Sequence, residues 1–207
     1  MAKASGGTRG GGGGGNRSAG GGMSAKDILS KYPDIAAKVK DAAVRDDLVE
    51  AIQEMQKEYG VMPNSIQFIN RKNNQAGSQS EFGMTTINLK YLGDKSASQK
   101  MYTGTFHPQG TEKKPAKSTM VHELAHKIEF VHGRYGSKMS KDLDAAYKSF
   151  MSGWRQGKKS NPAAHSLGGQ ATYNKSEYFA EALSGYHAGL KNQYTKAAYK
   201  IAKKYSK

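Results

Sequence analysis

The chain has 207 residues, of which 32 are lysine or arginine and 17 are aspartate or glutamate, so its formal net charge is +15. It has no cysteine, which excludes disulfides, thiolate metal ligands and cysteine nucleophiles and leaves histidine and carboxylate side chains as its strong metal ligands. No stretch approaches the roughly 20 apolar residues that a membrane-spanning helix needs, so no membrane span is expected. The positive charge attracts polyanions, and we expect nonspecific nucleic-acid association through a lysine-rich surface.

The N-terminal segment 1–23 is rich in glycine and has three basic residues but no acidic one. Such a segment cannot bury apolar surface and predicts a disordered tail. Without it, residues 24–207 carry a net charge of +12 and are long enough to form one domain. The N-terminus lacks the apolar run of a signal peptide, so we expect the protein to be cytoplasmic at synthesis. Its final localisation, including release or packaging by a non-classical route, stays open.

The first part of this domain combines helical and extended patterns. Apolar residues recur every three or four positions over 24–60, which predicts helices that end at Gly60. Alternation of apolar and polar residues predicts three strands, at 65–70, 84–92 and 101–106. Two segments have the composition of exposed loops, 71–80 and 107–117.

The stretch 118–132 contains the sequence His-Glu-Leu-Ala-His and has the apolar spacing of a helix that ends at Gly133. Residues four apart lie on one face of a helix, so His122 and His126 can bind the same Zn²⁺ ion. Glu123 is then placed beside a metal-bound water and can accept its proton as a general base while the water attacks a carbonyl. The pattern therefore predicts a catalytic zinc centre.

Local signals define the neighbouring elements. The motif helix should begin at a capping residue, either Ser118 or Thr119. Further helices are expected at 138–155, after Asn174 and at 189–207. The segment 156–172 contains glycine and proline and predicts an irregular loop, which at this length is often functional.

A catalytic zinc usually has three protein ligands, so the motif leaves one to find. His132 lies ten residues after the first histidine, which is the metzincin spacing, but Glu129 occupies the glycine position that this spacing needs. His165 lies in the irregular segment. Glu177 follows a helix N-cap, and a second carboxylate, Glu181, lies one turn further on, where it could orient a zinc-bound histidine.

The motif H-E-L-A-H, followed by N-K-S-E-Y-F-A-E-A-L, resembles the anthrax lethal-factor-like metalloproteases, a gluzincin group that includes the Pro-Pro endopeptidases. The resemblance implies an α+β zincin-like domain, which we expect to be mostly helical with a small mixed sheet. It also implies Zn²⁺ as cofactor, a protein or peptide substrate, Glu177 as third ligand and Glu181 as its support. In such proteases a strand ahead of the motif helix forms the rim of the cleft, and we expect 84–92 or 101–106 to serve.

The chain departs from the family at one position. The family has a tyrosine seven residues before the ligand glutamate, and its hydroxyl helps to hold the transition-state oxyanion. Gln170 stands there in this chain. We expect Tyr173, four residues before Glu177, to take the role, with His165 or Gln170 as alternatives.

The sequence therefore predicts a zinc-dependent endopeptidase in which Glu123 is the general base. The competing hypothesis is a basic nucleic-acid-associated protein or a structural component of a particle that keeps a zincin scaffold. The complete H-E-x-x-H motif favours the enzyme, because a scaffold has no need of Glu123.

Overall fold

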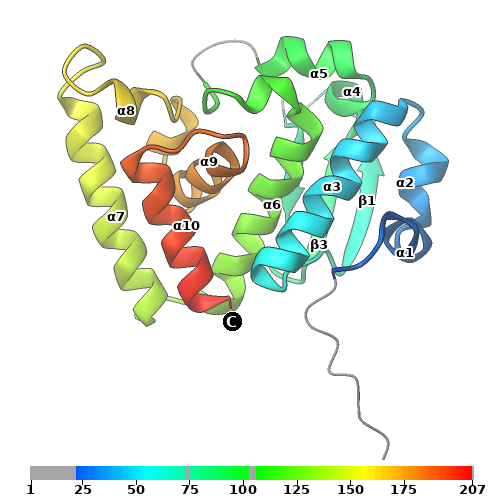
Figure 1. Ribbon diagram of the computed structural model, residues 1–207, viewed down its shortest axis with the longest axis horizontal. Helices are drawn as coiled ribbons and strands as arrows, with labels where there is room; N and C mark the ends of the chain where they lie inside the picture. Colours follow the sequence, from blue (N-terminus) through cyan, green and yellow to red (C-terminus); the bar gives the residue numbers. More distant parts are fainter. Residues whose placement is uncertain (1–21, 73–74, 103–105, 207) are drawn as a thin grey trace, which may run out of the picture.

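The computed structural model describes residues 22–72, 75–102 and 106–206. The predicted disorder of the tail concerns residues that lie almost entirely outside this part of the chain. Within it the protein is mostly helical with one small mixed sheet, which confirms the expected α+β class (Figure 1). Every described helix is too short or too polar to cross a bilayer.

The elements follow one another along the chain in the order helices, sheet, helices. The helices are α1 (Ala25–Lys31), α2 (Pro33–Lys38), α3 (Ala42–Tyr59), α4 (Leu89–Leu92), α5 (Lys95–Tyr102), α6 (Pro115–His132), α7 (Lys138–Arg155), α8 (Pro162–His165), α9 (Lys175–His187) and α10 (Gln193–Tyr205). The strands are β1 (Ser65–Ile69), β2 (Gly77–Gln79) and β3 (Met84–Asn88), and two 3-10 turns are η1 (Thr111–Lys113) and η2 (Gln170–Thr172).

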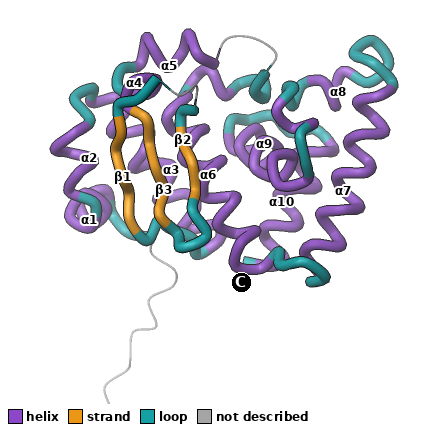
Figure 2. The backbone as a smooth tube through the Cα atoms, turned by 180° about the vertical axis from the view of Figure 1, so that it is seen from behind, coloured by secondary structure: helices purple, strands orange, loops and turns teal. Residues whose placement is uncertain are grey.

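The sheet has the strand order β1-β3-β2, with β1 parallel and β2 antiparallel to β3. Ser65 is in register with Met84, and Gly77 with Ile87. Figure 2 shows the sheet in front of α3 and α6 when the molecule is seen from behind. β2 is thus one of the two edge strands of this sheet, and it packs against α6.

Two of the three strand predictions need correction. The strand predicted at 84–92 ends at Asn88, because the Asn88 side chain accepts a hydrogen bond from the backbone N–H of Lys90 and starts the short helix α4. The strand predicted at 101–106 is wrong where the structure describes it, since Tyr102 belongs to α5; residues 103–105 lie outside the described part. Conversely, β2 lies in the segment 71–80 that was expected to be a loop.

Helix α6 forms the centre of the fold, packed between α3 on one side and α9 on the other (Figure 1). Its apolar residues Val121, Leu124 and Ile128 are fully buried. The helix begins at Pro115, one turn before the predicted caps, because proline at the first helical position has a suitable fixed φ and needs no N–H partner. It ends at Gly133 as predicted, where the glycine N–H bonds to the Glu129 carbonyl at 2.6 Å.

The C-terminal helices also follow local capping signals. The prediction of a helix at 138–155 is confirmed by α7, and α9 begins after Asn174, whose side chain accepts from the N–H of Glu177 at 2.9 Å. The last helix starts at Gln193 rather than at 189, because Asn192 caps it. The segment 156–172 contains α8 and η2, so it is less irregular than expected.

Candidate metal centre

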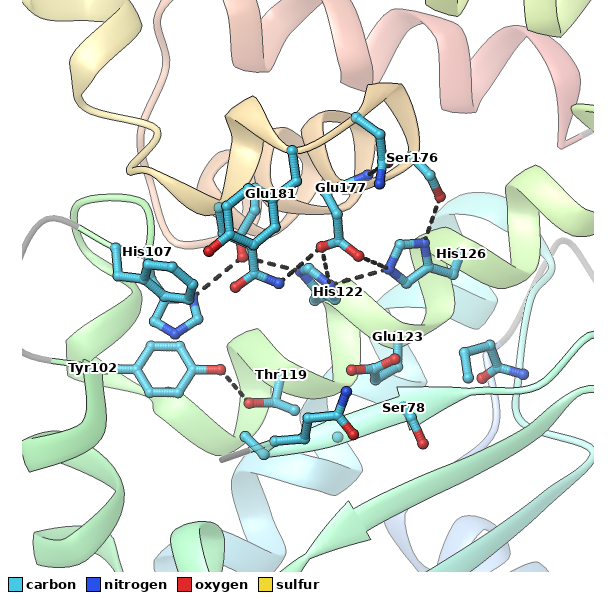
Figure 3. A pocket seen from close by; sticks show the side chains of 18 of the residues that line it. Ser78, Tyr102, His107, Thr119, His122, Glu123, His126, Ser176, Glu177 and Glu181 are labelled. Carbon is cyan, nitrogen blue, oxygen red and sulfur yellow. Dashed lines mark hydrogen bonds and ion pairs between the residues drawn. The ribbon is translucent and has the colours of Figure 1, made fainter. Parts of the chain in front are cut away.

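Three side chains from two helices meet in a cleft of about 550 Å³ between α6, α9 and β2 (Figure 3). Helix α6 presents His122 and His126 on one face, and the first turn of α9 presents Glu177 opposite them. Together they form a group that could hold a metal ion, with one ligand atom of each within 4.8 Å of the others. Glu177 lies 51 positions after His126 in the sequence, and the fold brings the two residues together, as expected.

The distances within this group fit one small cation. The Nε2 atoms of His122 and His126 are 3.1 Å apart, and the Glu177 carboxylate oxygens lie 3.4 Å from the first and 3.6 Å from the second. Tetrahedral ligands at about 2.0–2.1 Å from zinc are separated from each other by roughly 3.3–3.4 Å. The observed distances are close to this value, although a different Glu177 oxygen is nearest to each histidine: Oε2 to His122 and Oε1 to His126.

The outer nitrogen of each histidine is held by a partner that fixes the ring. Nδ1 of His126 lies 3.0 Å from the Ser176 hydroxyl, which itself donates to the Glu129 carboxylate. Because the Ser176 proton goes to Glu129, its oxygen accepts the N–H of His126. Nδ1 of His122 lies 3.3 Å from the Glu181 carboxylate. Each ring therefore has a partner for an Nδ1 proton and directs its Nε2 atom toward Glu177, which is the nitrogen left for a metal ion.

Glu181 connects the candidate ligands His122, His126 and Glu177, called the metal group below, to a further histidine. Its side chain is only 2% exposed, and the same oxygen that faces His122 lies 3.2 Å from Nδ1 of His107. The His107 ring stacks on Tyr102, and the Tyr102 hydroxyl bonds to Thr119 on α6. A single buried carboxylate thus fixes the orientation of two imidazoles.

The electrostatics of the metal-free group follow from burial and close charges. Burial lowers the pKa of His126 to about 4, and the charge of His122 adds to the effect. Burial acts against the charge of His122 too, but Glu181 and Glu177 outweigh it and raise the pKa of that ring well above its usual value. For Glu177 burial is outweighed by the hydrogen bond and charge of His122, so its pKa falls to about 2. A cation that binds here must displace the proton of His122.

Glu123 lies beneath this group on the inner side of the cleft (Figure 3). It is buried, and burial together with the charges of Glu177 and Glu181 raises its pKa to about 7. Strand β2 passes directly over it: a Cβ built on Gly77 would lie 2.8 Å from Glu123 Oε1 and 2.9 Å from a Thr119 methyl. The carboxyl group is thus confined by backbone that only a glycine permits there.

The structure separates the alternatives that the sequence left open. Neither His132 nor His165 belongs to the group that could hold a metal; the His165 ring instead stacks on Trp154 and its Nε2 meets the Trp154 carbonyl at 3.0 Å. Gln170 lines the cleft and donates to the Glu177 carboxylate at 2.8 Å. Tyr173 lies on the rim of the cleft with 65% of its surface exposed.

The strand that lines the cleft ahead of α6 is neither of those that we expected. Of the expected segment 101–106, Tyr102 and Phe106 do line the cleft, but Tyr102 belongs to α5 and Phe106 to the loop before α6. The strand at the cleft is β2, an edge strand that lies within the lining segment from Gln75 to Gln79. Sequence reasoning also missed the parts played by His107, Ser176 and Glu129. His107 lies in a loop without periodicity, and only the tertiary fold brings it to Glu181. For Glu129 the sequence did hold a signal, since a carboxylate stands where the metzincin pattern has glycine.

The chain matches no family model, and neither the curated proteins nor the solved structures contain a protein with significant similarity to it.

Proposed function

We propose that this protein is a zinc-dependent endopeptidase of the gluzincin type. The observation that carries the proposal is the convergence of His122, His126 and Glu177, in which Nε2 of both histidines faces inward and one ligand atom of each residue lies within 4.8 Å of the others. Two nitrogen lone pairs held 3.1 Å apart repel each other unless a proton or a cation lies between them. The donor set of two imidazoles and one carboxylate is the one that zinc hydrolases use.

A zinc ion bound to these residues would supply an activated water and polarise the carbonyl of the substrate. Glu123 would accept the proton of that water and pass it to the leaving amine. Burial favours the neutral form of this carboxyl group, so it can hold the proton between the two steps. Glu181 and Ser176 would hold the two imidazoles in the orientation that the site needs.

The shape of the cleft supports a peptide substrate. Among the residues that the structure describes, β2 pairs with β3 alone, so its other edge can accept an extended peptide as an added strand. Tyr173 lies on the opposite rim, where its hydroxyl could approach the carbonyl of a bound peptide. Gln170, already bonded to Glu177, is less free to do so.

The test uses Glu123→Gln in the full chain, with Glu112→Gln as the matched control. Glu112 carries an ordinary structural contact, a hydrogen bond from the N–H of Gly110, and lies outside the cleft. We expect Glu123→Gln to bind one zinc per chain, as the unaltered protein does, and to lose cleavage of a randomised octapeptide mixture by a factor of about 100 or more. Cleavage that survives in Glu123→Gln, or an unaltered zinc-loaded protein that cuts no peptide, would refute the proposal.

A further inference from the structure

One end of the cleft is built from a row of four aromatic rings: Tyr173, Phe106, His107 and Tyr102. The rings of Tyr173 and Phe106 meet edge to face with centroids 6.0 Å apart, and Phe106 meets His107 in the same way at 5.0 Å. His107 is stacked on Tyr102 at 4.3 Å. All four line the cleft, and they come from three separate parts of the chain: the end of α5, the loop before α6 and the residue that follows η2.

The two outer rings of this aromatic row are open to solvent. Phe106 is 47% exposed and Tyr173 is 65% exposed, while Tyr102 is buried. Neither outer ring belongs to the buried hydrophobic core. Two aromatic rings in contact at the mouth of a cleft form an apolar surface that folding alone does not require, and such surfaces mark binding sites.

The inner end of the row reaches the metal group. Nδ1 of His107 lies 3.2 Å from the Glu181 oxygen that also faces His122 at 3.3 Å. Figure 3 shows His107 and Tyr102 on one side of His122, with His126 on the other. A side chain resting on the row therefore belongs to a residue whose backbone passes close to the proposed scissile position.

The charge of the cleft narrows the kind of side chain that fits. Its walls carry three glutamates, Glu123, Glu177 and Glu181, and in the described part of the chain no lysine or arginine lines it, although the protein as a whole is strongly basic. One divalent cation does not neutralise three carboxylates. An acidic side chain on the row would meet this negative field without a cationic partner, whereas an aromatic ring would gain contact with the row.

We propose that the aromatic row is a substrate subsite that binds a bulky aromatic side chain beside the scissile bond and disfavours an acidic one. This assignment rests on the proposed peptidase function for its role, but the binding of an aromatic group can be measured without turnover.

The first experiment measures specificity in the full-length, zinc-loaded protein. Products of a randomised octapeptide mixture are sequenced by mass spectrometry for the unaltered protein and for Phe106→Ala and Tyr173→Ala. The matched controls are Phe82→Ala and Tyr135→Ala, which remove the same kinds of ring from exposed positions outside the cleft. We expect aromatic residues to be enriched at one position relative to the cut, and Phe106→Ala or Tyr173→Ala to lower that enrichment about 2- to 10-fold, with no change in the controls.

The second experiment separates the subsite from the reaction. Saturation-transfer NMR detects N-acetyl-phenylalanine amide on the Glu123→Gln protein, with N-acetyl-alanine amide and N-acetyl-aspartate amide as comparison probes. We expect transfer to the phenyl protons that is lost in Phe106→Ala and Tyr173→Ala and kept in the two controls.

The outcomes are distinct. Phenyl binding that depends on the row, together with an unaltered zinc-loaded protein that cuts no peptide, supports the subsite and rejects the peptidase. Cleavage without aromatic enrichment, together with equal transfer to the phenylalanine and alanine probes, supports the peptidase and rejects the subsite. Preference for an acidic residue at the position next to the cut also overturns the proposal.

Discussion

Replacing Glu181 with glutamine tests whether this buried carboxylate controls the metal group. The carboxylate faces Nδ1 of His122 at 3.3 Å and Nδ1 of His107 at 3.2 Å, and it is almost completely buried. An amide keeps the volume but loses the charge, and its NH₂ group cannot accept an imidazole N–H. The amide oxygen can still accept from His122, because a single Glu181 oxygen faces both rings, but His122 loses the negative charge that holds its ring more strongly and increases its basicity.

Removal of such a supporting partner typically costs 10- to 100-fold in metal affinity. We therefore expect Glu181→Gln to weaken zinc binding by that factor, or about 1.4–2.8 kcal/mol at tenfold per 1.4 kcal/mol. The affinity is measured by competition with a fluorescent chelator at constant pH. The control is Glu58→Gln, which removes a carboxylate from an ion pair with Lys203 at the surface of α3. Equal zinc affinity in Glu181→Gln and the control would refute the argument.

Four further predictions follow from other parts of the structure. Gly77→Ala places a Cβ 2.8 Å from Glu123, so we expect a loss of about 1–3 kcal/mol in unfolding free energy and a fall in cleavage. The control, Gly136→Ala, lies at an open position with positive φ and should leave cleavage unchanged. A fully active Gly77→Ala would contradict the close approach of β2. Tyr173→Phe keeps the ring and removes the hydroxyl: an oxyanion role predicts slower cleavage with the same aromatic enrichment, and an unchanged rate would remove Tyr173 from that role. Burial would raise the pKa of Glu54, but His187 and Lys117 outweigh it and lower the pKa to about 2. This carboxylate therefore stabilises the fold above the unfolded pKa of 4.5 and loses that contribution as pH falls toward 2. In denaturant titrations, the unfolding free energy of Glu54→Gln should decrease less over this pH range than that of the unaltered protein, by about 3 kcal/mol at most, and parallel curves would reject the assignment. The affinity of nonspecific DNA binding by the lysine-rich surface, measured by fluorescence anisotropy, should decrease steeply between 50 and 200 mM salt and be weaker still in a Lys196→Glu, Lys200→Glu variant. Affinity retained at physiological salt would favour the alternative nucleic-acid-associated role.

The sequence predicted the parts of the metal group that depend on local geometry. A helix brings residues four apart onto one face whatever surrounds it, so the pairing of His122 with His126 needed no knowledge of the fold. Asn174 caps α9 for an equally local reason and places Glu177 in its first turn. Only the meeting of these two helices required tertiary structure, and there the resemblance to a known pattern supplied the expectation.

The parts that the sequence did not predict depend on contacts between distant segments. β2 is short and polar, so its sequence has no alternation of apolar residues from which a strand could be predicted. It becomes a strand because β3 offers it hydrogen-bonding partners. His107 carries no pattern of its own and is defined by Glu181, 74 residues away. The predicted strand at 84–92 was too long because its alternation continues past Asn88, where a side-chain cap starts a helix instead.

The lysine-rich surface shows the same limit. Helix α10 has no acidic residue of its own, yet Lys203 pairs with Glu58 of α3 at 2.9 Å and Lys204 pairs with Asp142 of α7 at 2.8 Å. The carboxylates that offset its charge come from neighbouring helices, so a count along α10 alone overstates the free positive charge of this face.

The most direct test of the central claim is the zinc affinity of the chain when each candidate third ligand is removed in turn. We expect the unaltered protein to bind one zinc per chain, Glu177→Ala to lose at least about 100-fold in affinity, and His132→Ala and His165→Ala to bind as the unaltered protein does. Full zinc affinity in Glu177→Ala, or its loss in His132→Ala or His165→Ala, would contradict the account.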